Sequence, residues 1–164
     1  MHLLVQKGYT RGIELALSMR NFEDPVDAEG ETILHEAAKY DQLEIVKKIC
    51  ESQNNLNLER RDKAGETPLH KAVRYGHDEV VDYLVYRGAD IHAKTSEGST
   101  SLHLAARYCR KKILEVIRLI SQIRSLHFLP NVDNAKKCFG NVLKNILLTN
   151  SDIDCKRRKY DPKR

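Results

Sequence analysis

One pattern of residues recurs three times along the chain, and it constrains the fold more than any other feature. Each copy places a leucine, a histidine and an alanine after a threonine, and the three threonines are separated by 35 and 33 residues. A period near 33 is the signature of a repeat architecture, in which each unit buries its apolar surface only against its neighbours. The copies read Thr32-Ile33-Leu34-His35-Glu36-Ala37, Thr67-Pro68-Leu69-His70-Lys71-Ala72 and Thr100-Ser101-Leu102-His103-Leu104-Ala105.

Residues 62–94 are the best-formed copy, and they predict a turn, a helix, a second turn, a second helix and a loop. Thr67 can cap the first helix through its hydroxyl, and Pro68 suits the first helical position. Gly76 breaks that helix and Gly88 ends the second one, because glycine adopts the left-handed conformation without strain. The second helix shows an apolar face at helical spacing, formed by Val80, Val81, Leu84 and Val85.

This unit resembles the ankyrin repeat family, and the match extends to Gly65-Glu66-Thr67-Pro68-Leu69-His70, to Gly76 and to Gly88-Ala89-Asp90. The resemblance covers residues 27–121 strongly and the preceding residues weakly. It implies an all-α ankyrin-repeat solenoid of stacked helix-turn-helix units with short β-turn hairpins. It also implies a non-enzymatic protein–protein interaction module, an adaptor or an inhibitor, whose partner the fold does not specify.

The repeat pattern also suggests how the chain is divided. Residues 1–26 align with the repeat when Gly8 is placed on Gly76, but the opening turn is missing, so a partial or capping repeat is expected there. Asp41 and Cys109 stand at the same glycine position in the two flanking copies. The three full repeats are expected at residues 27–61, 62–94 and 95–127. Helices are expected near 33–40 and 43–52 in the first, and apolar spacing predicts a long second helix in the third.

The array is expected to end before Pro130, which disfavours helical geometry at the preceding residue. Residues 134–147 have the spacing of one more amphipathic helix, inside a C-terminal capping region over residues 128–154. Residues 155–164 form a basic tail of six Lys or Arg and one Asp, which is predicted to be disordered. The other 154 residues are neutral, so the net charge of +5 belongs to the tail.

Composition favours a soluble chain of the cytoplasm. No apolar run is long enough for a membrane span, and the four cysteines are scattered with no Cys-x-x-Cys pair, which favours free thiols. The cluster Lys156-Arg157-Arg158-Lys159 is a candidate nuclear-localisation signal, and a disordered solubilising end is the alternative.

The repeated histidines invite a catalytic or metal-binding interpretation, but their spacing opposes it. His35, His70 and His103 occupy one repeat position, so they lie about one repeat apart in a stack, too far to share a metal ion. In the ankyrin family this histidine bridges turns by hydrogen bonding. No catalytic or phosphate-loop motif is present. The expectation is therefore no enzyme, no cofactor, no metal, no small-molecule substrate and no specific nucleic acid.

A basic residue followed by tyrosine precedes the glycine-type position of every repeat, in Lys39-Tyr40, Arg74-Tyr75 and Arg107-Tyr108. In the ankyrin family these positions lie at the end of the inner helix, on the concave side where partners bind. Tyrosine and arginine are enriched at interface hot spots. The resemblance therefore implies a basic and aromatic palm that contacts a protein partner.

The turns carry glutamates that predict acidic finger tips beside this palm: Glu29, Glu31, Glu66 and Glu97. Partner contacts are expected at the three basic–tyrosine pairs and at Glu31 and Glu66. The other interpretation is that the tyrosines pack between helices as repeat filler and that the basic residues are only solvated.

Two further functions stay open. The chain is similar to small inhibitory ankyrin proteins that mask transcription-factor dimers of the NF-κB type. It is also similar to a structural piece of a larger ankyrin-repeat protein, such as a membrane-anchoring ankyrin, a channel or a toxin.

Overall fold

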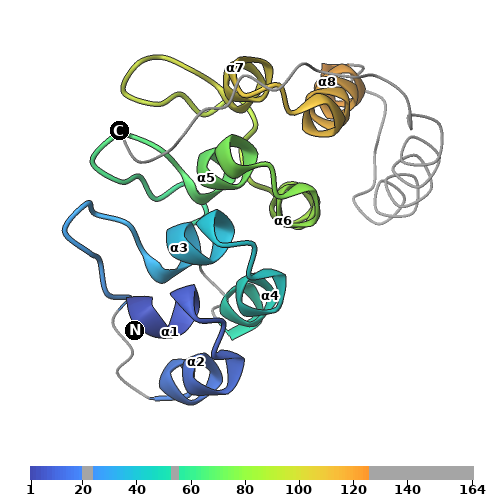
Figure 1. Cartoon of the computed structure of the whole chain (residues 1–164). Helices are drawn as coiled ribbons and strands as arrows, with labels where there is room; N and C mark the ends of the chain where they lie inside the picture. Colours follow the sequence, from blue (N-terminus) through green and yellow to red (C-terminus); the bar gives the residue numbers. More distant parts are fainter. Residues whose placement is uncertain (20–23, 53–55, 126–164) are drawn as a thin grey trace. The chain divides into compact units, whose positions relative to one another are not determined.

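The computed structural model describes residues 1–19, 24–52 and 56–125, with side chains in the last helix up to Ser121. The described residues form eight helices in four consecutive pairs (Figure 1). The pairs are α1 (His2–Gln6) with α2 (Thr10–Leu17), α3 (Ile33–Lys39) with α4 (Leu43–Ser52), α5 (Pro68–Tyr75) with α6 (Asp78–Tyr86), and α7 (Ser101–Arg107) with α8 (Lys111–Ser125).

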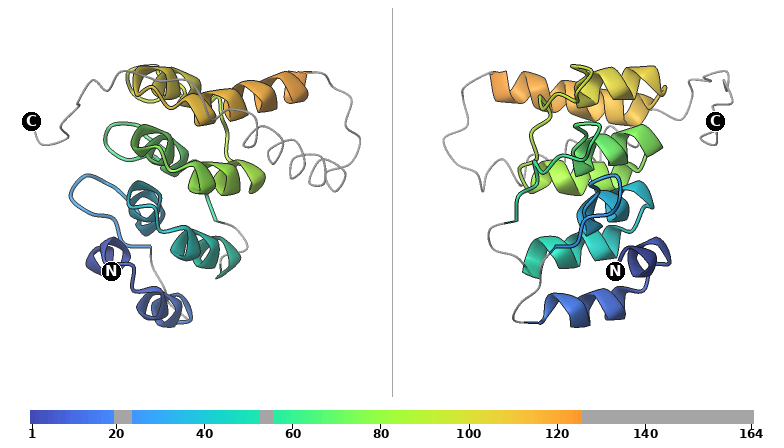
Figure 2. Two further views of the ribbon diagram at one scale, coloured as in Figure 1. Left: turned by 45° about the vertical axis from the view of Figure 1, so that its right-hand side comes forward. Right: turned by 90° about the vertical axis from the view of Figure 1, so that its left-hand side faces the viewer.

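The pairs stack in chain order. The first helices α1, α3, α5 and α7 lie beside one another, and the second helices α2, α4, α6 and α8 form a neighbouring row (Figure 2). Each pair therefore contacts the pair before it and the pair after it. The expected all-α solenoid is confirmed for the described part of the chain.

The recurring threonine and histidine begin three of the first helices. Thr32, Thr67 and Thr100 are N-cap residues with extended backbone, and in each case the histidine three positions on bonds back to the threonine. This reciprocal arrangement satisfies two N–H groups that a helix start would leave without partners.

A residue with left-handed backbone follows the end of each first helix. Gly76 has φ 84°, and Asp41 and Cys109, at the same repeat position, have φ 58° and φ 54°. Glycine adopts this conformation freely, whereas a side chain adds strain. Asp41 and Cys109 therefore adopt the left-handed turn conformation, although glycine would adopt it with less strain.

Apolar residues at the predicted spacing fill the space between helices. Leu69, Val73, Val81 and Leu84 are at most 1% exposed. The second helix of the last described pair is long, as predicted: α8 has 15 residues against 9 in α6. Its described apolar face is buried, through Ile113, Val116, Ile117 and Ile120.

Short turns link the pairs and are bonded to one another. The turn at residues 62–66 is closed by a bond from Asp62 N–H to the Glu66 carbonyl, at 3.0 Å. Its Lys63 N–H donates to the Glu29 carbonyl of the preceding turn, at 2.9 Å. The described residues contain no regular strand and one isolated bridge, between Val26 and Thr32.

Several predictions concern residues outside the described part of the chain. They are the capping region at 128–154 with its helix at 134–147, and the basic tail at 155–164 with its nuclear-localisation candidate Lys156-Arg157-Arg158-Lys159. In the part that is described, no helix combines the length and the apolar character that crossing a membrane requires.

Candidate functional site

The three basic–tyrosine pairs lie where the first helices end. Tyr40 and Tyr108 follow α3 and α7 as C-cap residues, and Tyr75 is the last residue of α5. Because these three helices lie beside one another, the pairs form one row across the stack. We call this row the ladder, and it consists of Lys39, Tyr40, Arg74, Tyr75, Arg107 and Tyr108.

Contacts between neighbouring repeats run along the ladder. Gln6 Nε2 donates to the Tyr40 hydroxyl at 2.9 Å, which joins the α1 pair to the α3 pair. The Arg74 guanidinium lies 5.4 Å from the centre of the Tyr108 ring, which joins the α5 pair to the α7 pair. A cation within about 6 Å of a ring centre is attracted by the ring's quadrupole. The ladder residues therefore help to hold successive repeats together.

Other contacts fix the tyrosines within their own repeats. Lys39 Nζ lies 5.6 Å from the centre of the Tyr40 ring. The Tyr75 ring stacks on the His77 ring, with 6.3 Å between centres and 7° between planes. All three ladder tyrosines are half-buried, so each offers part of its surface to solvent. The geometry thus gives them a packing role and leaves them accessible to a partner.

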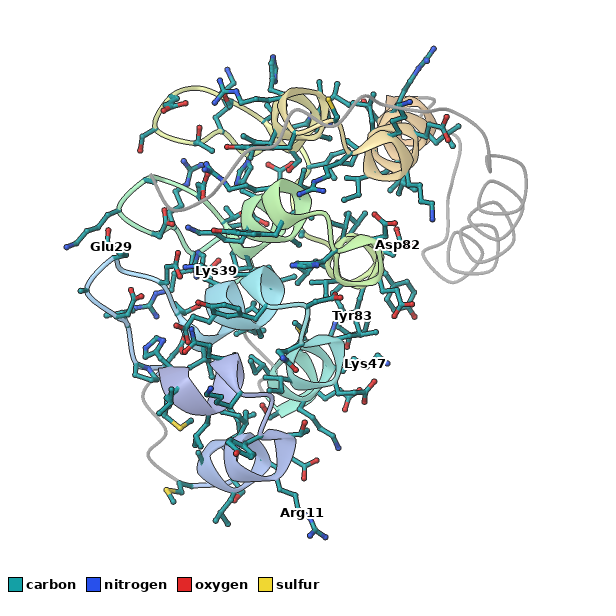
Figure 3. All side chains as sticks on the ribbon, viewed as in Figure 1. Arg11, Glu29, Lys39, Lys47, Asp82 and Tyr83 are labelled. Carbon is teal, nitrogen blue, oxygen red and sulfur yellow. The ribbon has the colours of Figure 1, made fainter. Side chains whose placement is uncertain are left out.

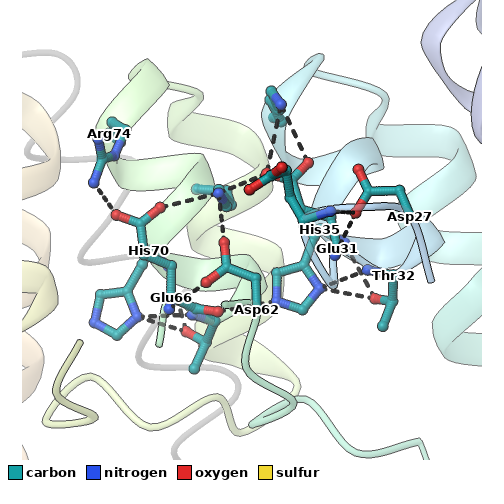
Figure 4. A network of polar contacts seen from close by, with 12 residues as sticks. Asp27, Glu31, Thr32, His35, Asp62, Glu66, His70 and Arg74 are labelled. Atoms are coloured by element: carbon teal, nitrogen blue, oxygen red, sulfur yellow. Dashed lines mark hydrogen bonds and ion pairs between the residues drawn. The ribbon is translucent and has the colours of Figure 1, made fainter. Parts of the chain in front are cut away.

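A buried charged cluster lies next to the ladder (Figure 4). Lys71 is 8% exposed, and its Nζ lies 2.6 Å from Glu31 Oε1, 2.7 Å from Asp62 Oδ2 and 3.1 Å from Glu66 Oε2. Two ladder residues complete the cluster, since Lys39 pairs with Glu31 at 3.1 Å and Arg74 pairs with Glu66. The cluster therefore contains three cations and three carboxylates.

The charged groups of the cluster compensate one another. Burial by itself would lower the pKa of the Lys71 ammonium, but its bonds to Asp62 and Glu31 outweigh burial and raise that pKa. Burial would likewise raise the pKa of the Asp62 carboxyl, but the Lys71 ammonium and the Glu66 N–H outweigh it and lower that pKa. These shifts keep Lys71 and Asp62 charged at neutral pH. The formal charges of the three cations and the three carboxylates cancel.

The prediction that Glu31 and Glu66 stand at exposed finger tips is wrong. They are 3% and 2% exposed and belong to the charged cluster. The residue after the turn glycine lies at the base of the turn, where Asp62 Oδ1 accepts from Glu66 N–H at 2.8 Å. The exposed glutamates are those at the tips, Glu29 and Glu97, of which Glu29 is labelled in Figure 3.

Sequence reasoning missed Lys71 and Asp62. The available signal was a change of residue type at the position directly after the repeated histidine. That position is occupied by Glu36, Lys71 and Leu104 in the three copies. A lysine at a position where another repeat carries leucine indicates a buried site with carboxylate partners.

The repeated histidines have the structural role predicted for them. His35 Nδ1 accepts from Thr32 N–H at 3.1 Å, so its Nε2 carries the proton and donates to the Glu66 carbonyl at 3.0 Å. His70 repeats this arrangement with Thr67 and the Ala93 carbonyl. Burial lowers the pKa of both imidazoles, which keeps them neutral. His35 and His70 therefore each join their own repeat to the following turn, whereas the exposed His103 is bonded to Thr100 of its own repeat.

One group of possible metal ligands occurs among the described residues: His2, Asp27 and Glu36. His2 Nδ1 lies 2.8 Å from Glu36 Oε2, which pairs the two groups with each other. Asp27 Oδ1 accepts from Glu29 N–H and Glu31 N–H, as turn aspartates commonly do. Ion pairing and turn formation thus already use these side chains.

Comparison with known families agrees with the fold and the repeated contacts. The family model for ankyrin repeats in three copies matches residues 1–95, which is more than half of the chain. The chain belongs to the ankyrin repeat family. A search of curated proteins finds no match.

Membership of this family indicates a protein-interaction module, and the family is in general non-enzymatic. The match begins at residue 1 and so includes the helix pair α1 and α2, where the opening turn of the repeat is missing. It ends before α7, although α7 and α8 continue the stack.

Proposed function

We propose that the chain binds another protein through the ladder and the exposed turn tips Glu29 and Glu97, and so acts as an adaptor or an inhibitor. The observation that carries the proposal is the row of three half-buried tyrosines, of which Tyr40 and Tyr108 contact neighbouring repeats and Tyr75 stacks on His77 of its own repeat. Fixed aromatic side chains offer a large contact area at a small entropic cost, and preordered surfaces bind more tightly.

The charged cluster bears on the chemistry of the partner. Lys39 and Arg74 are neutralised by Glu31 and Glu66, and the exposed Arg107 lies 3.3 Å from Glu97. The ladder is therefore not an unpaired basic surface. We expect recognition to depend on aromatic contact and tyrosine hydroxyl groups rather than on an excess of negative charge in the partner.

The proposal is tested by capturing partners from a lysate with the intact chain and identifying them by mass spectrometry. Affinities are then measured for each purified partner. Tyr75→Ala is expected to weaken binding about tenfold or more, which corresponds to about 1.4 kcal/mol, because central contacts are best shielded from water. Tyr40→Ala and Tyr108→Ala are expected to have smaller effects.

A matched control separates binding from folding. Tyr86 on α6 is 55% exposed and lies outside the ladder, so Tyr86→Ala removes an accessible tyrosine elsewhere. Tyr75→Phe keeps the stacked ring and removes only the hydroxyl. If Tyr75→Ala lowers the melting temperature but binds every captured partner normally, the ladder is part of the scaffold, and the exposed tips Glu29 and Glu97 become the next surface to test.

A further inference from the structure

Two of the three ladder cations have a buried counter-ion in their own turn. Lys39 pairs with Glu31 and Arg74 pairs with Glu66 (Figure 4), and the side chains of both carboxylates are at most 4% exposed. Arg107 occupies the same repeat position as these two cations, 33 residues after Arg74. The repeat register therefore predicts a third carboxylate, 33 residues after Glu66.

Ser99 stands where that carboxylate would be. The turn is built as in the preceding repeat: Thr95 N–H donates to the Ser99 carbonyl at 2.9 Å, and Ser99 N–H donates to Thr95 Oγ1 at 3.2 Å. Asp62 and Glu66 make the same two bonds. Ser99 is 8% exposed, so its place in the turn is that of Glu66, and the carboxylate is what the third repeat lacks.

The third repeat keeps the ladder cation although it replaces the rest of the charged cluster. Three positions that are charged in the preceding repeat carry neutral side chains here, namely Thr95, Ser99 and Leu104. Leu104 takes the place of the central cation Lys71. The groups that would neutralise a ladder cation are therefore absent from these positions, while Arg107 retains its charge.

The contact between Arg107 and Glu97 differs in kind from the buried pairs. Arg107 Nη1 lies 3.3 Å from Glu97 Oε2, and the two side chains are 53% and 74% exposed. An exposed ion pair contributes little free energy, so a carboxylate from another molecule can displace Glu97 with little loss. The Arg107 guanidinium is therefore accessible to a partner.

The surroundings of Arg107 are basic. Residues 95–121 contain five Lys or Arg and two Glu, whereas residues 62–94 contain five Lys or Arg and six Asp or Glu. The Arg110 guanidinium lies beside the ladder, where it donates to the Arg74 carbonyl at 3.0 Å. A surface of one sign attracts groups of the opposite charge and orients them as they approach.

We propose that this end of the ladder binds the carboxylate of an Asp or Glu from an acidic segment of the protein partner, at Arg107 and beside the half-buried Tyr108. The inference rests on the function proposed above and adds one charged contact to its aromatic contacts. A carboxylate fits, because the chain itself places one against Lys39 and Arg74, and arginine can bind it through two parallel N–H groups. The partner thus supplies the counter-ion that the third repeat lacks.

A display library of random peptides, selected on the intact chain, tests the proposal. The peptides that bind are expected to be enriched in Asp and Glu over the input library. An enriched peptide is then synthesised in two forms, one with its acidic residue and one with the corresponding amide. Arg107→Gln is expected to weaken binding of the acidic form about tenfold and to leave binding of the amide form unchanged, because the amide has no charge to pair.

Ser99→Glu tests the same contact without changing Arg107. It restores the carboxylate that Glu66 provides in the preceding repeat, so it should also weaken binding of the acidic form about tenfold. The matched control is Arg118→Gln, which removes an exposed arginine of the same repeat, on α8 and outside the ladder, and should change neither affinity. Circular dichroism checks that each variant keeps its helices, and if Ser99→Glu does not fold, Arg107→Gln against Arg118→Gln decides.

Four results overturn the proposal. The selection enriches no acidic residues, Arg107→Gln weakens both forms of the peptide equally, Arg118→Gln weakens binding as much as Arg107→Gln does, or a single-stranded RNA of mixed sequence binds through Arg107 more tightly than every selected peptide.

Tyr75→Ala separates this inference from the function on which it rests. Peptides that need Tyr75 but no carboxylate support the proposed function and overturn the inference. A carboxylate that depends on Arg107, in peptides that Tyr75→Ala binds normally, supports the inference and contradicts the role proposed for the tyrosines.

Discussion

Two junctions between repeats use the same backbone contacts but different side chains. In the first junction, between the α3 and α5 pairs, His35 bonds the Glu66 carbonyl, and in the second, between the α5 and α7 pairs, His70 bonds the Ala93 carbonyl, both at 3.0 Å. The position that holds Lys71 among three carboxylates at the first junction holds Leu104, 1% exposed, at the second. The first junction is therefore electrostatic at its centre and the second is apolar.

Two separate kinds of contact therefore hold neighbouring repeats together. The first layer of contact is the bond from each histidine to a backbone carbonyl, and the second is made by the side chain that follows each histidine. The histidine-to-carbonyl bond needs no particular residue in the following repeat, because every residue has a carbonyl. The side chain one position after the histidine, in contrast, requires partners of matching chemistry from its neighbours. The first layer sets the register of the repeats, and the second decides which repeats fit next to each other.

Removal of the central cation should have the largest effect. Lys71→Ala leaves Glu31, Asp62 and Glu66 buried with a deficit of positive charge, and loss of one partner from a buried ion cluster costs about 3–5 kcal/mol. The free energy of unfolding, measured by urea denaturation at pH 7, is expected to fall by this amount. Leu104→Ala is expected to lower it by about 2–5 kcal/mol, because it removes apolar burial and leaves a cavity but no unpaired charge.

A background without the carboxylates distinguishes charge from packing. In a chain with Glu31→Gln, Asp62→Asn and Glu66→Gln, the change Lys71→Met should be nearly neutral, because no buried charge is left to compensate. If Lys71→Met is as damaging in this background as in the wild-type chain, the assignment of the first junction as electrostatic is wrong.

The two junctions should also differ in how their contribution to the free energy of unfolding depends on pH, and this difference is expected to be smaller than the effects of the substitutions at Lys71 and Leu104. Burial lowers the folded pKa of His35 and His70 below 6.5, so the unfolded state takes up protons first, and both junctions lose stability as pH falls below that value. The pKa of Asp62 is below its ordinary 3.8, so its contribution is present above 3.8 and is lost as pH falls through its folded pKa. That second loss belongs to the first junction alone.

The Lys71→Met variant provides the control for this titration. Without the ammonium, burial dominates and raises the pKa of the Asp62 carboxyl, so the sign reverses and acid should stabilise the variant relative to the wild type. Urea denaturation from neutral pH to about pH 3 measures both slopes. Parallel curves for the two proteins would contradict the role assigned to the charged cluster.

The smallest effect is expected at the left-handed position after each first helix. Cys109→Gly should stabilise the chain by about 0.5–1 kcal/mol, because glycine relieves the strain at φ 54°. Asp41→Gly should gain less, since aspartate tolerates this conformation better and Asp41 Oδ1 lies 3.6 Å from His77 Nδ1.

Gly76→Ala tests the same position in the opposite direction. A side chain at φ 84° is strained, and its Cβ would lie 2.6 Å from the Arg110 guanidinium carbon, so the melting temperature should fall. If Cys109→Gly also lowers the melting temperature, backbone strain does not control this turn.

The fold was predictable because its determinants are local. The spacing after Thr32 predicted helices near 33–40 and 43–52, and they occupy Ile33–Lys39 and Leu43–Ser52. The capping threonine and the paired histidine lie three residues apart, so one short motif contains the whole signal. The long α8 followed in the same way from apolar spacing alone.

The charged cluster was not predictable in this way because its members come from different repeats. Glu29 and Glu31 are the same residue type two positions apart, but one is exposed and the other is 3% exposed. Glu31 differs from Glu29 by its ion pairs with Lys39 and with Lys71, which is forty positions away in the sequence. Pairing of this kind is a property of tertiary structure and leaves no periodic signal in a single sequence.

The position after each histidine also limits how such a gene can be rearranged. Excision of residues 62–94 would join α4 to the α7 pair. His35 could still donate to a backbone carbonyl, now one of the turn that follows the excision. Leu104 would then occupy the place of Lys71 beside Glu31, and that carboxylate would keep only its pairing with Lys39. Duplication or shuffling of single repeats would meet the same obstacle, so the repeats of this segment are not interchangeable units.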